Sequence, residues 1–525
     1  MIPLSGCQQG EGKKTGRGDL EGEAAVDDFV LNEVTVELLQ QKMERGSETA
    51  RSITELYLQR IEEIDRAGPK LKSVIEVNPE ALQIADELDA ERAAGKVRGA
   101  LHGVPVMIKD NIGSADQMQT TAGSLALAGS KTKRDSQVVQ KLRQAGAVIL
   151  GKTNLSEWAN FRSVSSSSGW SSRGGQTRNP YVLDRTPCGS SAGSAVAVAA
   201  NLCALAVGTE TSGSLVCPSS VNGIVGIKPT VGLIGRSGII PISETQDTAG
   251  PMARTVRDAA ILLGALTGGD ERDARTLESE GKSHDDYTKF LSEQGLKEVR
   301  LGVPTSLMGV NAEADHLLVA ALDLLEQQGA ELVKVEGELV AGAGEVLTVL
   351  LYEFKHGLNR YLQRDATGAE VKSLTQVLAF NREHVKRVMP FFKQELLELA
   401  ESKGDLQSEE YLQAREKSLK GAREEGLDRV MTEHKLDGLV ASTSGPAWAT
   451  DLLYGDRRGT GGCAAMPAQA GYPHITVPMG SVHGLPVGLS FFGKAWSEPT
   501  LLKMAYAYEQ ASKKRVAPEF KDEVM

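Results

Sequence analysis

The sequence contains few aromatic residues and no block of charge of one sign. Aromatic side chains make up 5% of the 525 residues, and 58 basic residues stand against 69 acidic ones, for a net charge of −11. The charges are spread along the chain, without the basic face that a nucleic-acid-binding protein presents. The composition therefore indicates a soluble globular protein and argues against nucleic acid as its partner.

Apolar runs long enough to cross a membrane are missing as well. The longest run, residues 195–207, is interrupted by Asn201. It falls short of the roughly 18–20 residues that a transmembrane helix needs. We expect this run to form a buried helix instead.

The cysteines lack the spacing of a metal site or of a disulfide framework. None stands in a Cys-x-x-Cys pair or at ligand spacing from a histidine, so we expect neither bound zinc nor a disulfide framework. The five cysteines are Cys7, Cys188, Cys203, Cys217 and Cys463.

The N-terminal segment allows two interpretations. Leu4–Cys7 resembles a bacterial lipobox, and a polar tract to about Asp28 follows it like the tether of an envelope lipoprotein. Only three residues precede the match, so the apolar part of a signal peptide is absent. Residues 1–28 therefore have two possible interpretations. They are the tether of a trimmed lipoprotein, and the protein is then secreted or held at the cell envelope. Otherwise they are a disordered tail, and the protein is then cytoplasmic.

Helices and short apolar strands alternate from about Phe29 onward. The pattern predicts helices over 52–66, beginning with a capping box at Ser52 and Glu55, and over 136–144 and 314–328, with strands over 103–108, 147–150 and 331–335. Such alternation indicates an α/β fold, with a sheet covered by helices on both faces. We see no linker in residues 29–525 and expect a single domain.

Two segments interrupt this alternation. Residues 268–295 are polar, and we expect them to form a surface excursion. Residues 340–430 are mostly helical with scattered aromatics. We interpret them as a helical cover over one face of the sheet, with a substrate lid as the alternative.

The most unusual composition lies between residues 163 and 250. A Ser/Gly tract leads to residues 187–194, which run into an Ala-rich helix, and residues 208–214 form a second Gly/Ser loop. Loops of this kind can direct several N–H groups at one point, to hold a phosphate or an oxyanion. The Gly-Lys-Ser/Thr ending of a P-loop, the dinucleotide fingerprint and the Gly-x-Ser-x-Gly elbow are all absent.

A serine nucleophile in these loops needs a base, and the eight histidines offer no obvious partner. A lysine can replace histidine where burial lowers its pKa enough to give the neutral amine. Lys109 ends the apolar strand that begins at Gly103, so we expect its ammonium to be partly desolvated.

These features together resemble the amidase signature family over roughly residues 30–515. The matching runs are Lys109-Asp110, 151–154, 189–191, 208–214, 226–232, 246–251, 470–473 and 484–489. Residues 217–218, 445–448 and 472–478 are similar to those of the branch resembling peptide amidase.

The resemblance implies a fold, a reaction and a set of roles. It implies a large, mixed, twisted sheet with helices on both faces and the hydrolysis of a carboxamide to a carboxylic acid and ammonia. Ser214 is implied as the nucleophile, Lys109 as the base and Ser190, after a cis peptide bond, as the relay between them. The implied oxyanion hole consists of the backbone N–H groups of Thr211, Ser212, Gly213 and Ser214. No metal or cofactor is implied.

The substrate is less defined than the reaction. Val216 stands where many members of the family carry an arginine that can hold a carboxylate, so a small diacid amide is a poor candidate and a neutral or peptidyl amide a better one. Trp158, Asn160, Phe161 and Trp448 are nominated to line the pocket. We expect a monomer or a homodimer that acts on a small-molecule or peptide amide.

Two other functions remain open at this point. The chain could be the amidase subunit of a tRNA-dependent amidotransferase, which would require a partner subunit. It could also be a non-catalytic amidase-like scaffold, although such scaffolds usually lose the lysine or a serine of the triad.

Overall fold

The computed structural model describes residues 29–337, 343–457 and 461–524. Residues 33–525 form one compact unit, and residues 1–32 are a separate one. The lipobox-like Leu4–Cys7 and the polar tract to Asp28 lie outside the described residues.

The centre of the compact unit is a mixed sheet of eleven strands. Its order is β1-β4-β2-β7-β9-β8-β14-β15-β13-β10-β11. The strands are β1 (Val74–Val77), β2 (Pro105–Lys109), β4 (Val148–Thr153), β7 (Leu205–Glu210), β8 (Val225–Lys228), β9 (Thr248–Ala253), β10 (Arg300–Pro304), β11 (Glu331–Val335), β13 (Gly438–Ser442), β14 (His474–Val482) and β15 (Leu485–Phe492). Strand β2 runs parallel to β4 and β7, whereas the pairs from β7 through β13 are antiparallel. The sheet is therefore mixed, as the resemblance implied.

Helices cover both faces of this sheet, as predicted. Helices α4 (Gln137–Gln144), α7 (Val256–Leu266), α16 (Glu498–Ser512) and α8 (Ala312–Gln327) contact one another in that order and also contact strands. On the other face, α5 (Ala192–Ala199) and α6 (Val216–Val221) contact each other and the central strands. Every residue of α5 is buried, which explains its Ala-rich sequence.

Local sequence signals gave several of these elements correctly. The Ser136 hydroxyl accepts from Val139 N–H at the start of α4, Gly146 adopts a φ of 78°, and β4 follows. Strand β11 coincides with the predicted strand 331–335. Helix α8 begins two residues before the predicted helix 314–328.

Two local predictions were wrong. Residues 195–207 are not one helix, because α5 ends at Ala199 and β7 begins at Leu205, with Asn201 in a left-handed turn (φ 57°). The capping box lies at Thr49 and Ser52, so helix α2 spans Ala50–Arg60 and continues as a π-helical segment, Ile61–Ala67. Apolar character alone does not separate a buried helix from a buried strand.

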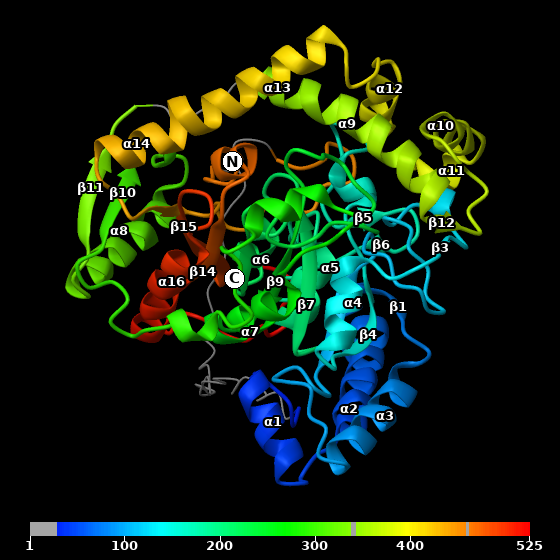
Figure 1. Cartoon of the computed structure of the whole chain (residues 1–525), viewed down its shortest axis with the longest axis horizontal. Helices are drawn as coiled ribbons and strands as arrows, with labels where there is room; N and C mark the ends of the chain where they lie inside the picture. Colours follow the sequence, from blue (N-terminus) through cyan, green and yellow to red (C-terminus); the bar gives the residue numbers. More distant parts are fainter. Residues whose placement is uncertain (1–28, 338–342, 458–460, 525) are drawn as a thin grey trace, which may run out of the picture. The chain divides into compact units, whose positions relative to one another are not determined.

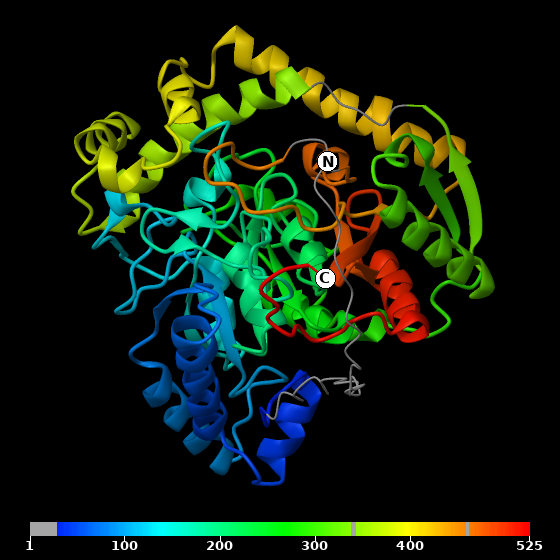
Figure 2. The same cartoon turned by 180° about the vertical axis from the view of Figure 1, so that it is seen from behind.

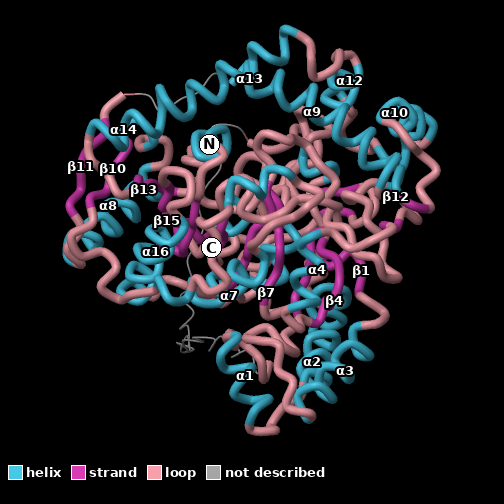
Figure 3. Tube along the Cα trace, in the orientation of Figure 1, coloured by secondary structure: helices cyan, strands magenta, loops and turns pink. Residues whose placement is uncertain are grey.

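The predicted helical segment crosses the loops at one end of the sheet. Helices α9 (Ala343–Arg364) and α13 (Glu409–Ala422) pack on each other and form the arch in Figures 1 and 2. Figure 3 shows loops between this arch and the strands. The buried side chains Phe354 and Leu358 of α9 pack with residues of the loops around 158 and 240.

This position corrects the expectation of a layer over one face of the sheet. Only the later part of the segment, including α14 (Asp428–Glu433), packs on strands, in a cluster with Leu439 of β13 and Phe492 of β15. Within the described ranges, no helix is long and apolar enough to cross a membrane.

Candidate functional site

Lys109 is the last residue of β2, an inner strand between β4 and β7, and its side chain is fully buried. Its Nζ lies 2.7 Å from Ser190 Oγ, 3.0 Å from Ser191 Oγ, 2.9 Å from Thr209 Oγ1 and 3.1 Å from Thr209 O. An ammonium has only three protons for these four oxygens, and a neutral amine has two protons and a lone pair. In the neutral form, the amine could therefore accept a proton from a neighbouring hydroxyl.

Burial lowers the pKa of the Lys109 ammonium to about 7. Desolvation is the main cause, and it outweighs the opposing effect of the Asp247 and Glu210 carboxylates. The lysine is more deeply buried than the partial desolvation expected from its place at a strand end. About half of the molecules therefore carry the free amine near neutral pH.

Ser190 begins the turn that leads into α5. The Gly189–Ser190 peptide is cis, as the resemblance implied, and Ser190 is fully buried. A Cβ at Gly189 would lie 2.3 Å from Ser156 Oγ, so only glycine allows the turn to pack this closely. This packing brings the Ser190 hydroxyl to the lysine.

The loop that carries Ser214 is held by the buried carboxylate of Glu210. Glu210 accepts hydrogen bonds from the backbone N–H groups of Gly213 (2.8 Å), Leu215 (2.7 Å) and Val216 (3.2 Å). The N–H of Gly213, one of the four expected oxyanion donors, is thus directed at Glu210.

Ser214 lies beside the lysine site but is not joined to Ser190. The Ser191 N–H donates to Ser214 O at 3.1 Å, and Ser214 retains 8% of its exposure. Among the described residues, no hydrogen bond links the hydroxyls of Ser190 and Ser214. The structure thus joins Lys109 to Ser190 directly and holds Ser214 close through the backbone.

The two serine loops are also joined by a disulfide between Cys188 and Cys217. This bond corrects the expectation from cysteine spacing. The two cysteines are 29 residues apart in sequence, with Cα atoms 6.1 Å apart, because α5 and β7 return the chain to the same place. Cys203 and Cys463 are buried free thiols.

The four nominated pocket residues lie in two places. Trp158 and Phe161 pack against Phe354 of α9, and Asn160 lies between them in sequence. Residues 158–160 form a left-handed turn with φ values of 54°, 52° and 72°. Trp448 is half-buried beside the disulfide, in the cluster that contains Cys188. The structure therefore does not bring the four together.

A cavity of about 340 Å³ lies on the side of the helical arch and is lined by Thr209, which contacts the lysine. Its inner end is lined by Asn111, Thr209, Thr211 and Asp247. Asn111 donates to Thr209 Oγ1 at 3.0 Å, and the Thr211 hydroxyl donates to Asp247 at 2.5 Å. Desolvation raises the pKa of Asp247 to about 6 despite the hydrogen bonds that it accepts. The cavity therefore adjoins both Lys109 and the loop that leads to Ser214.

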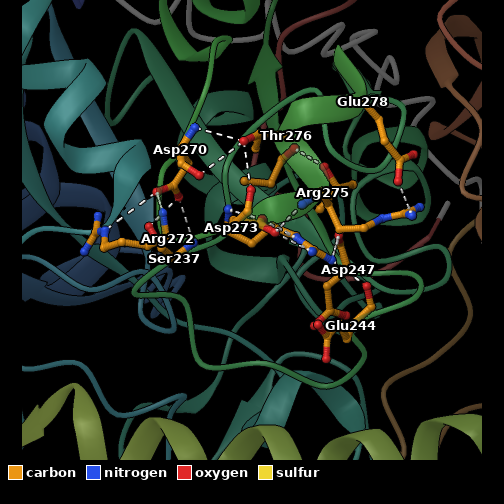
Figure 4. A network of polar contacts seen from close by, with 12 residues as sticks. Ser237, Glu244, Asp247, Asp270, Arg272, Asp273, Arg275, Thr276 and Glu278 are labelled. Carbon is orange, nitrogen blue, oxygen red and sulfur yellow. Dashed lines mark hydrogen bonds and ion pairs between the residues drawn. The ribbon is translucent and has the colours of Figure 1, made fainter. Parts of the chain in front are cut away.

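The segment expected as a surface excursion supplies one wall of this cavity. The Asp270 carboxylate accepts from the Ser237 hydroxyl, the Asp270 N–H donates to Thr276 Oγ1, and Arg272 lies at one edge of the same network (Figure 4). Asp273 forms two hydrogen bonds with Arg236, of 2.7 and 2.8 Å. This polar segment is thus partly internal, and its charges are mostly matched by one another.

Several residues that the sequence analysis did not single out belong to the site. Ser191 and Thr209 contact the lysine, and Glu210 holds the nucleophile loop. All three stand inside the two Gly/Ser runs that carried the resemblance, which was the available signal. Among the described residues, no group of three or more His, Cys, Asp or Glu side chains could hold a metal ion.

The comparisons with known proteins agree with one another. The family model described as Amidase matches residues 52–502. The crystal structure of peptide amidase from Stenotrophomonas maltophilia is 49% identical, covers 94% of this chain and 99% of its own, and superposes with a TM-score of 0.89. A protein of Arabidopsis thaliana named a probable amidase is 40% identical over 94% of this chain and 92% of its own.

A further relative, designated as an amidase in Schizosaccharomyces pombe, is 38% identical over 94% of this chain and 87% of its own. These relatives come from a plant and a yeast as well as from Stenotrophomonas. The bacterial source that the lipobox-like segment would imply is therefore not supported.

Proposed function

The chain belongs to the Amidase family and is a hydrolase of amide bonds, and we propose that it acts through Lys109, Ser190 and Ser214 on a neutral amide, in particular the C-terminal amide of a peptide. The observation that carries the triad is the fully buried Lys109, with a pKa lowered to about 7, at 2.7 Å from Ser190 Oγ. A base with a pKa near the working pH is the most effective kind.

The proposed reaction moves one proton along three groups. Ser214 Oγ attacks the amide carbon, its proton passes to Ser190 Oγ, and the proton of Ser190 passes to Lys109 Nζ. The proton then returns along the same path to the amide nitrogen, the C–N bond breaks and ammonia leaves. A water molecule attacks the acyl-enzyme in the same way and restores Ser214.

The path requires the Ser214 hydroxyl to turn toward Ser190 when substrate binds. Such contacts are commonly longer in an unoccupied site than in the complex. The oxyanion is assigned to the N–H groups of Thr211, Ser212 and Ser214, and that of Gly213 joins them if it leaves Glu210. We assign no metal or cofactor to the reaction, and a monomer or homodimer suffices for it.

Labelling with a serine-directed fluorophosphonate tests the nucleophile. We expect the wild-type protein to be labelled and Ser214→Ala not to be, with Ser402→Ala, at an exposed serine, as the matched control. Labelling of Ser214→Ala at the wild-type rate would refute Ser214 as the nucleophile. A wild-type protein that is not labelled would favour a non-catalytic scaffold.

Ammonia release from a panel of amides tests the substrate. Peptides ending in –CONH₂ should react faster than glutamine, because Val216 provides no cation for its carboxylate, and faster than the small diamide malonamide. The reverse ranking would reject the peptide-amide substrate while leaving the amidase activity in place.

A further inference from the structure

The mouth of the cavity beside Lys109 carries two arginines without a carboxylate partner. Strands β3 (Lys131–Thr132) and β12 (Ala366–Thr367) pair antiparallel, with Thr132 opposite Ala366, and Lys133 N–H donates to Asp365 O at 3.2 Å. Continuing this register places Arg134 opposite Arg364. Both side chains are exposed and line the cavity.

The other charges around the cavity are largely matched by near neighbours. Arg236 is bound to Asp273, Arg360 lies 4.0 Å from Glu244, and Arg272 lies 3.6 Å from a carboxylate oxygen of Asp270, outside the cavity. The carboxylates deeper in the cavity, Asp247 and Glu353, accept hydrogen bonds from hydroxyl and backbone N–H groups.

Five arginines and five carboxylates line the cavity as a whole, so the unmatched positive charge is local to Arg134 and Arg364. Neither Arg134 nor Arg364 forms an ion pair with any residue that the structure describes, and neither does Asp365, which also lines the cavity. Two guanidinium groups thus stand against one carboxylate. Unpaired guanidinium groups on the wall of one cavity favour an anionic ligand.

Two buried polar atoms farther in also lack partners. Tyr361 and Asn111 are each 3% exposed and line the cavity, and within the described ranges Tyr361 Oη and Asn111 Oδ1 have no hydrogen-bond partner. Burial raises the pKa of Tyr361, so its hydroxyl remains a donor. A buried polar group left unpaired is unfavourable, and a ligand can supply the missing partner.

All four groups line the same cavity, and Asn111 adjoins a neighbour of Lys109. Tyr361 and Arg364 are three residues apart on α9 and therefore face the same way. Asn111 donates to Thr209 Oγ1, which lies 2.9 Å from Lys109 Nζ. A molecule in this cavity could reach from the arginines at the mouth to the reacting end, in a volume typical of small-ligand sites.

We propose that this cavity is a substrate subsite in which Arg134 and Arg364 bind a carboxylate of the substrate, with Tyr361 and Asn111 as hydrogen-bonding groups along its length. The inference rests on the proposed function and makes it more specific: the preferred amides are peptides with an acidic side chain ahead of the amidated residue. Val216 provides no cation for a carboxylate next to the scissile amide, so the acidic side chain is assigned to Arg134 and Arg364.

The test uses N-acetylated tripeptide amides that carry glutamate at the first or the second position, each paired with its glutamine analogue. At low salt, we expect at least one glutamate peptide to have a KM roughly fivefold lower than its analogue, the size of effect that exposed arginine–carboxylate pairs supply. Raising the salt concentration should reduce this advantage, because the mouth is open to solvent.

Variants identify the arginines. In Arg134→Gln and Arg364→Gln, the KM of the preferred glutamate peptide should rise to that of its glutamine analogue, while kcat and the KM of the analogue stay the same. Arg382→Gln, at an exposed arginine of helix α10 (Leu374–Glu383) paired with Glu398, should leave the advantage intact. Equal KM values within both peptide pairs of the wild-type protein, or an advantage that survives in both variants, would overturn the subsite.

A calorimetric titration of the same peptides into Ser214→Ala separates this inference from the proposed function. If no peptide amide is hydrolysed but a glutamate peptide still binds more tightly than its analogue in an arginine-dependent way, only the peptide-amide activity fails. If hydrolysis proceeds and binding shows no glutamate preference, only the subsite fails.

Discussion

Replacing Lys109 by methionine should remove a pH dependence of stability that the buried lysine creates. The pKa of this lysine falls from an ordinary value of 10.5 to about 7 in the folded protein. Between these values the unfolded chain holds one proton more than the folded one, so stability rises with pH. One proton corresponds to about 1.4 kcal/mol per pH unit, and the full interval to about 5 kcal/mol as an upper value.

Urea unfolding of wild type and Lys109→Met at pH 7, 8 and 9 measures this difference. Methionine fills a similar volume but has no charge. The oxygens of Ser190, Ser191 and Thr209 lose their hydrogen-bond partner, and the free-energy cost of this loss does not depend on pH. The free energy of unfolding of the wild type, relative to the variant, should therefore rise by about 1 kcal/mol per pH unit over this range. Lys152 and Lys228, also buried with pKa values lowered to about 8, are unchanged in both proteins and cancel in the comparison.

The same lysine should set the pH dependence of activity. With a pKa of about 7, the fraction of free amine, and with it kcat/KM, rises about tenfold between pH 6 and pH 8. Lys109→Met should lower kcat by about 10²–10⁴, and Lys393→Met, at an exposed lysine, should not. A stability difference that is flat between pH 7 and 9, or a wild-type rate that is flat between pH 6 and 8, would refute a neutral buried lysine as the base.

Three further predictions concern the groups that hold the site. Glu210→Gln replaces one accepting oxygen by an NH₂ group, so the loop that carries Ser214 should loosen. We expect kcat to fall by about 10–100-fold with little change in KM. A changed KM with an unchanged kcat would contradict this positioning role. Replacing Cys188 and Cys217 together by serine should lower the free energy of unfolding by about 3–4 kcal/mol, and equal unfolding midpoints with and without the pair would contradict it. Arg162→Met leaves the buried Glu157 carboxylate without its ion-pair partner at 2.8 Å and should lower the free energy of unfolding by about 3–5 kcal/mol in thermal or urea unfolding. Adding Glu157→Gln should recover part of this stability, and no recovery would argue against the ion pair as the cause.

The sequence predicted best those elements whose signals are local. Helix α4 has its capping serine and its terminal glycine within a few residues of each other, and β11 is a short apolar run between two turns. The run over residues 195–207 was misjudged because both a buried helix and a buried strand are apolar on every side. The change at Asn201, where the chain leaves α5 and turns into the sheet, depends on packing that periodicity does not record.

The same distinction applies to the site. The two Gly/Ser runs and Lys109 stand out in the sequence, and with the family resemblance they give the triad as a hypothesis. The partners Ser191 and Thr209, by contrast, are recognised only once β2, α5 and β7 lie side by side. The disulfide of Cys188 and Cys217 escaped the spacing argument for the same reason.

By itself, the sequence determined the α/β class, the family and the loops that bring serines, glycines and a lysine to the chemistry. These features depend on residue types and short spacings, which can be read directly from the sequence. Only the tertiary structure decided how far Lys109 is desolvated, that Glu210 holds the loop of Ser214 and that Arg134, which follows β3, and Arg364 of α9 line one cavity. Burial and charge balance arise between segments hundreds of residues apart, and they exist only after the chain has folded.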